Sequence, residues 1–66
     1  MAATYKFFYY ISNNNSLQQK EYISPHNIQN VAPYFLGENQ SAIKVERIDI
    51  LADPDGINTD EALGYN

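Results

Sequence analysis

Alternating hydrophobic and polar positions predict that the chain opens with a β-strand over residues 4–12. This segment is rich in aromatic and β-branched side chains, and it ends at the turn-forming run 13–16. One face of the strand is apolar and the other amphipathic: the first carries Tyr5, Phe7, Tyr9 and Ile11, the second Lys6, Phe8 and Tyr10. Because both faces carry aromatic rings, both need a covering layer.

A second strand is predicted over residues 17–23, where the alternation is weaker, and we expect it to pair with the first as a hairpin. Ser24 and Pro25 follow, and this pair is typical of a helix start. Serine caps a free backbone N–H, and the N–H that proline lacks would have no partner at the first helical position.

Apolar residues then recur with helical spacing, at Ile28, Val31 and Phe35. Gly37 is a typical helix terminator. Pro33 disturbs this pattern, because proline inside a helix removes one hydrogen bond and clashes with an earlier carbonyl. The sequence therefore predicts one helix with a kink, or two short turns with a break near Asn30.

Residues 42–51 predict the third strand. Ile43 and Val45 alternate inward, but the next apolar pair, Ile48 and Ile50, is displaced by one residue. One inserted residue reverses the facing of every residue after it, so this pattern predicts a β-bulge or sharp bend near Glu46 and Arg47.

These elements predict an α+β fold in the order strand, strand, helix, strand. A three-stranded antiparallel sheet would carry the helix on one face, within a single domain spanning residues 1–51. Residues 52–66 would form an acidic, partly ordered C-terminal tail, with a turn at 53–56 and one capped helical turn at 59–64.

Charge is distributed unevenly between these two parts. Residues 1–51 contain four basic and four acidic side chains, so the net charge of -4 belongs to residues 52–66. A phosphate backbone would be repelled there and would find no basic patch elsewhere, which argues against nucleic-acid binding. The apolar run 7–11 is too short for a signal peptide or a membrane span, so we expect a soluble cytoplasmic protein.

Candidate chemistry is sparse. His26 is the only histidine, and without a cysteine or second histidine nearby we expect an ordinary surface or capping residue. The oxygen-rich segment 53–61 suggests weak calcium binding, but its spacing fails the EF-hand pattern, because Leu51 and Ala62 would fall at ligand positions. No nucleophile elbow or phosphate-binding glycine loop is present, so we expect no enzymatic activity, no cofactor and no metal.

The aromatic residues are the strongest functional signal. One helix can cover only one sheet face, so Phe8 and Tyr10 would stand on the opposite face, near Tyr22. Exposed rings of this kind mark recognition surfaces. The alternative is that Lys6, together with flanking loops or the tail, covers them.

We therefore expect a small non-catalytic protein-binding module of the adaptor or inhibitor type, such as a phage or accessory protein. Homodimerisation is one form this binding could take. The acidic tail would engage a partner with a basic surface. The predicted partner-binding residues are Phe8, Tyr10, Tyr22, Asp53, Asp55, Asp60 and Glu61. The alternative is binding of single-stranded nucleic acid by base stacking on the three rings.

Two segments give the chain a loose resemblance to the small linker domains of cyanobacterial phycobilisomes: an extended segment ending at a proline, 22–25, and an Ile/Val strand, 42–48, with a helix between them. The resemblance implies a role in assembly. Those domains are basic and carry a Gly-Gly before the last strand, where this chain is acidic and has Gln40 and Ser41.

Overall fold

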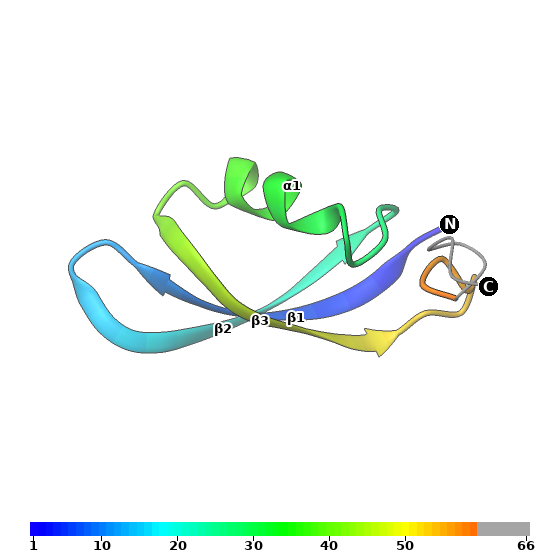
Figure 1. Ribbon diagram of the computed structural model, residues 1–66, viewed down its shortest axis with the longest axis horizontal. Coiled ribbons are helices and arrows are strands. Elements are labelled where there is room, and N and C mark those ends of the chain that lie inside the picture. Colours follow the sequence, from blue (N-terminus) through cyan, green and yellow to red (C-terminus); the bar gives the residue numbers. More distant parts are fainter. Residues whose placement is uncertain (60–66) are drawn as a thin grey trace.

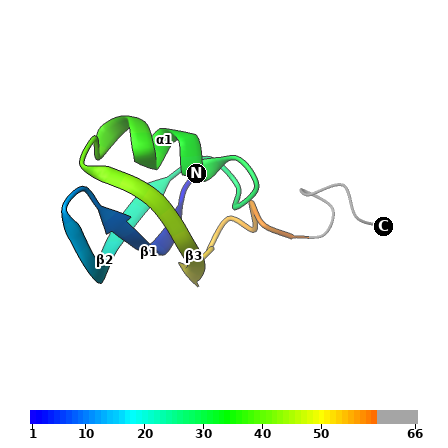
Figure 2. The same ribbon diagram turned by 60° about the vertical axis from the view of Figure 1, so that its left-hand side comes forward.

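The computed structural model describes residues 1–59, and within them the predicted class and element order are confirmed. The elements are β1 (Ala3–Ile11), β2 (Asn14–Ser24), α1 (Val31–Glu38) and β3 (Ala42–Ala52). The strands form one antiparallel sheet in the order β2-β1-β3, and α1 lies over one of its faces (Figures 1 and 2). The helical turn expected at 59–64 lies almost wholly outside the described residues.

The β1–β2 hairpin has a tighter turn than the sequence suggested. Its turn contains only Ser12 and Asn13, so β2 already begins at Asn14. Asn13 has a φ of 65°, in the left-handed region that asparagine tolerates better than most residues because its short polar side chain can bond locally. The pairing is regular from Ala3–Ser24 to Tyr9–Gln18, and the surplus residues of β2 are absorbed beyond that point.

The bulge predicted in β3 is confirmed. Val45 lies opposite Tyr9 and Arg47 opposite Phe8, which leaves Glu46 as the inserted residue. A second register shift, which the sequence analysis missed, follows one step further on. It makes Ile43 the extra residue between the partners of Tyr10 and Ile11.

Ile43 is 63% exposed for this reason, so its expected inward position is wrong. Ala42 packs against the core in its place. Two inserted residues within five positions reverse the facing of the strand twice, which simple alternation cannot express.

The helix begins later than Ser24 and Pro25 suggested, and Pro33 explains why. α1 begins at Val31, which places Pro33 in its first turn, where a backbone N–H would have no intrahelical acceptor. The expected pair of helical turns with a break near Asn30 is therefore wrong: the structure has one short helix, which begins directly after Asn30. The carbonyl of Asn27 accepts hydrogen bonds from the N–H groups of Asn30 and Val31, at 3.0 and 2.9 Å, in the turn before it.

The helix ends one residue after the expected terminator. Gly37 lies inside the last turn, and α1 ends at Glu38. Asn39 closes this end, because its backbone N–H and its side-chain Nδ2 both donate to the carbonyl oxygen of Phe35, each at 2.9 Å.

The core lies between α1 and the face of the sheet that carries Tyr5 and Phe7, as expected. Both side chains are fully buried, together with Val31 and Phe35 of α1. The rings of Phe7 and Phe35 are stacked, with centroids 4.0 Å apart and planes inclined by 9°. Burial of one such side chain stabilises a fold by about 1.5–3 kcal/mol, so this aromatic stack is a main source of stability in a chain without cysteine.

A hydrogen-bond network ties the segment after β3 to this core. The amide of Asn58 donates through Nδ2 to the Tyr5 hydroxyl at 2.8 Å, and its Oδ1 accepts from the backbone N–H of Ile28 at 2.7 Å. The Tyr5 hydroxyl donates in turn to the carbonyl of His26 at 2.6 Å. Asn58 thereby links β1 to the loop between β2 and α1, and Ile57 packs against the core beside it.

Candidate functional site: the open face of the sheet

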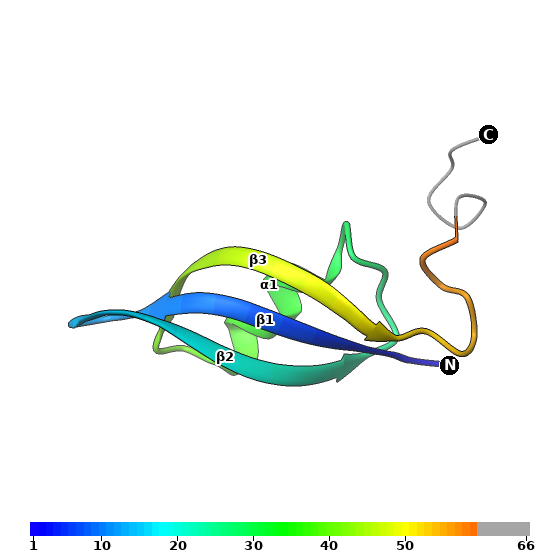
Figure 3. The ribbon, with the colours of Figure 1, turned by 90° about the horizontal axis from the view of Figure 1, so that it is seen from below.

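The face of the sheet opposite α1 has no second layer over it in the part of the chain that the structure describes (Figures 2 and 3). We call it the open face. Strand register assigns eleven residues to it: Thr4, Lys6, Phe8, Tyr10, Gln19, Glu21, Ile23, Lys44, Arg47, Asp49 and Ala52. This surface combines aromatic, aliphatic and charged side chains.

Phe8 lies at the centre of the open face but is not exposed. Only 8% of it is accessible, because the guanidinium of Arg47 lies 4.1 Å from its ring centroid and the ammonium of Lys6 lies 5.6 Å away. The expectation of a free ring is therefore wrong. The alternative, in which Lys6 covers it, is confirmed, with Arg47 as a second cover. Long cationic side chains do this because their stems are apolar and their charge is attracted to the ring face.

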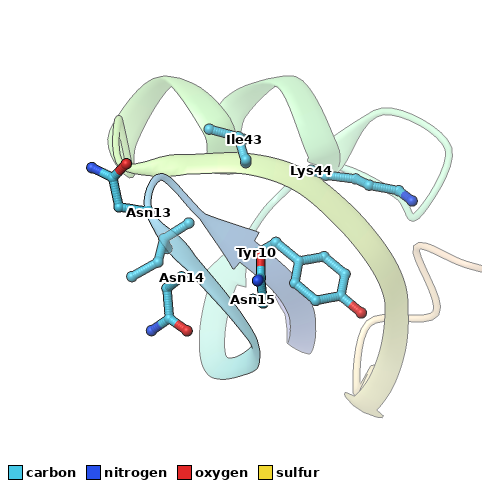
Figure 4. A pocket seen from close by; sticks show the side chains of 7 residues that line it. Tyr10, Asn13, Asn14, Asn15, Ile43 and Lys44 are labelled. Atoms are coloured by element: carbon cyan, nitrogen blue, oxygen red, sulfur yellow. The ribbon is translucent and has the colours of Figure 1, made fainter.

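Tyr10 lies on the open face opposite Lys44 and is partly exposed. Its ring borders a hollow of about 370 Å³ at the hairpin end of the sheet (Figure 4). The other lining residues come from the hairpin and the start of β3: Ile11, Asn13, Asn14, Asn15, Ile43 and Lys44. Tyr10 is therefore the aromatic residue of the open face that an outside molecule can reach.

Tyr22 does not join Phe8 and Tyr10, and its expected position is wrong. It lies opposite Tyr5 in the hairpin, so it points to the helix side, where its ring meets those of Phe7 and Phe35 edge-on at 5.8 and 5.4 Å. The signal that could have placed it is the hairpin register, which depends on the true turn length.

The hydroxyl of Tyr22 donates to a carboxylate oxygen of Glu38 at 2.5 Å. Burial, together with this bond and the negative charge of Glu38, raises the pKa of Tyr22 to about 12. Tyr22 thus links β2 to the end of α1, and its role in the fold is structural.

Charged groups on β3 pair with each other along the strand. The Nε of Arg47 lies 3.1 Å from Oδ1 of Asp49, and Nζ of Lys44 lies 3.5 Å from a carboxylate oxygen of Glu46. The Arg47 and Asp49 side chains are 62% and 43% exposed. Exposed pairs of this kind contribute about 0–1 kcal/mol, so a binding partner can replace them at little cost.

The predicted acidic residues do not act as one group. Both carboxylate oxygens of Asp53 accept backbone hydrogen bonds, from Ile57 and Asn58, each at 2.9 Å. Asp55 is exposed and accepts from the N–H of Ala2 at 3.1 Å. Asp60 and Glu61 lie outside the described residues, and residues 1–59 contain no cluster of potential metal ligands. Asp53 is therefore committed to its own turn.

Sequence reasoning missed an exposed aromatic pair on the helix side. The rings of His26 and Tyr34 are stacked, with centroids 3.7 Å apart and planes inclined by 5°. Tyr34 is half exposed. No periodic pattern marks this pair, because the loop before α1 brings the two residues together.

Comparison with known proteins adds no assignment: no family model, no curated protein and no solved structure matches the chain. Among the described residues, no helix has the length and apolar content that a membrane crossing requires.

Proposed function

We propose that this protein is a small non-catalytic protein-binding module that receives its partner on the open face. The supporting observation is the asymmetry of the sheet. One face carries α1 and the aromatic core, whereas the other lacks a covering layer within residues 1–59 and carries Tyr10 beside two cations seated on Phe8.

This surface favours a protein partner because it offers both apolar and charged contacts. Phe8 fixes the Arg47 guanidinium in place, so that less side-chain entropy is lost when a partner binds it. Tyr10 supplies a rigid ring, and Ile23, which is 70% exposed, supplies aliphatic area at the other end of the face. The exposed Asp55 adds a negative charge for a partner with a basic surface.

Single-stranded nucleic acid is the alternative ligand, and the geometry supports it less well. Base stacking needs several free rings on one face. Here Tyr22 lies on the other side of the sheet, and Arg47 and Lys6 occupy the face of Phe8. Arg47 is paired with Asp49, and Glu21 lies opposite Lys6 in the hairpin, so these positive charges are balanced.

Affinity capture from the native host tests the proposal, with the wild-type chain and a Lys6→Glu, Tyr10→Ser double variant as baits. Tyr34→Ser is the matched control, because it removes an exposed tyrosine from the helix side. We expect the wild type and Tyr34→Ser to retain a shared partner and the double variant to lose it. Identical capture by all three baits would refute the open-face proposal.

A labelled single-stranded oligonucleotide at low salt separates the two ligand classes. The protein-partner proposal expects no change in fluorescence anisotropy. Binding that weakens steeply with added salt would instead establish the nucleic-acid alternative.

A further inference from the structure

The sheet has two free edges, and the β3 edge carries the larger share of the exposed hydrophobic side chains. β2 and β3 each have only one neighbour, β1, so the outer backbone groups of both strands face away from the sheet (Figure 3). Three of the seven exposed large hydrophobic residues found within residues 1–59 lie on β3, namely Ile43, Ile50 and Leu51. An exposed strand edge with apolar side chains favours pairing with another strand.

We propose that β3 pairs antiparallel with β3 of a second copy, about a twofold axis at Ile48. In such a pair, residues directly opposite each other point to the same face. Centring on Ile48 places Arg47 opposite Asp49 of the second copy, and Asp49 opposite its Arg47. Ile48 then faces its own equivalent.

Charge selects this register from the neighbouring ones. Centring on Glu46, Arg47 or Asp49 would place like charges directly opposite each other, which is destabilising. Centring on Val45 pairs Lys44 with Glu46. The paired stretch of β3 then ends at Ala42 and Ile48, so Ile50 and Leu51 remain uncovered. The Ile48 register forms two opposite-charge pairs and keeps Ile50 and Leu51 within the length of β3 that lies alongside the second copy.

The backbone of β3 is suited to this register. Its pairing with β1 is regular from Arg47 to Ile50, and the register shifts lie on either side of that stretch. The proposed contact is centred within it. The product is a continuous six-stranded sheet in the order β2-β1-β3-β3-β1-β2, with both helices on one face and both open faces on the other.

Sedimentation equilibrium from micromolar to millimolar concentration at low salt tests the proposal. We expect a reversible monomer–dimer equilibrium in the wild type. Asp49→Lys leaves Arg47 on Phe8 but creates two repulsive cross-strand pairs, so the dissociation constant should rise roughly tenfold or more. The double variant Arg47→Glu, Asp49→Lys reverses both charges and should restore dimerisation.

Glu21→Lys is the control, because it makes the same charge change on β2, at the other edge; it should dimerise like the wild type. Circular dichroism of each variant confirms that it is folded. A wild type that is monomeric throughout overturns the proposal, as does a dimer that is insensitive to Asp49→Lys or not restored by the double variant. The equilibrium is measured without any other protein, so this result is independent of the proposed open-face partner.

Discussion

Replacing Asn58 by alanine tests whether the segment after β3 stabilises the domain. The Asn58 amide accepts from the N–H of Ile28 at 2.7 Å and donates to the hydroxyl of the fully buried Tyr5 at 2.8 Å. Alanine removes both bonds and leaves the Ile28 N–H without its acceptor. An unsatisfied buried group costs about 1–3 kcal/mol and a lost bond about 1 kcal/mol, so we expect a loss of about 2–4 kcal/mol.

This loss is large relative to the free energy of unfolding of the whole domain. A domain of this length has a free energy of unfolding of about 3–10 kcal/mol. Urea denaturation followed by circular dichroism measures it, and at a slope of about 1 kcal/mol per molar urea the midpoint should fall by about 2 M or more. Asn30→Ala is the matched control: it removes an exposed amide that bonds the Asn27 side chain at 3.0 Å, and it should cost less than about 1 kcal/mol.

A double-mutant cycle with Tyr5→Phe identifies the source of the loss. Both residues belong to one network that ends at the carbonyl of His26. The two substitutions should therefore be non-additive by about 0.5 kcal/mol or more. A loss below about 0.5 kcal/mol for Asn58→Ala, or strict additivity with Tyr5→Phe, would refute the reasoning.

Three further substitutions test local features. Asn13→Val should cost about 1–2 kcal/mol and Asn13→Gly almost nothing in chemical denaturation, because of the φ of 65° at this position; equal costs would contradict this. The raised pKa of Tyr22, about 12, means that its contribution to stability is complete below pH 10 and is lost as the pH rises towards 12. Ultraviolet titration should lose a transition near pH 12 in Tyr22→Phe and show this transition at a lower pH in Glu38→Gln. Pro33→Ala should change stability by less than about 1 kcal/mol, because Pro33 lies in the first turn; a gain near 3 kcal/mol would indicate a strained mid-helix proline.

The sequence was informative where the signal was local. Alternation located the strands, and the displaced apolar pair Ile48 and Ile50 revealed the bulge, because inserting one residue leaves a visible change of parity. The helix start was misplaced because Ser24 and Pro25 are residue types typical of a helix start, whereas α1 begins at Val31, with Asn30 at the cap position and Pro33 in the first turn. The buried Ser24 instead accepts through Oγ from the N–H of His26 at 3.1 Å, within the loop.

The candidate site was harder to predict because it depends on contacts between strands. Alternation along β1 predicted the sheet face on which Phe8 lies, but it did not predict that Arg47 covers the ring. Arg47 reaches the ring only because the bulge at Glu46 brings it opposite Phe8. Tyr22 was misplaced for a similar reason, since its face depends on a two-residue turn at the start of a run of five polar residues, 12–16.

The open face and the β3 edge are compatible surfaces, because strand pairing at an edge leaves the faces of the sheet free. A dimer formed through β3 would place two open faces side by side on one continuous surface, with the Arg47 and Asp49 pairs along its midline. A partner with two matching sites would then bind with a higher effective concentration than two separate monomers provide. Weak contacts at Tyr10 and Lys6 of each copy would then be sufficient for binding. This suits a face on which the central ring, Phe8, is already covered by the chain's own cations.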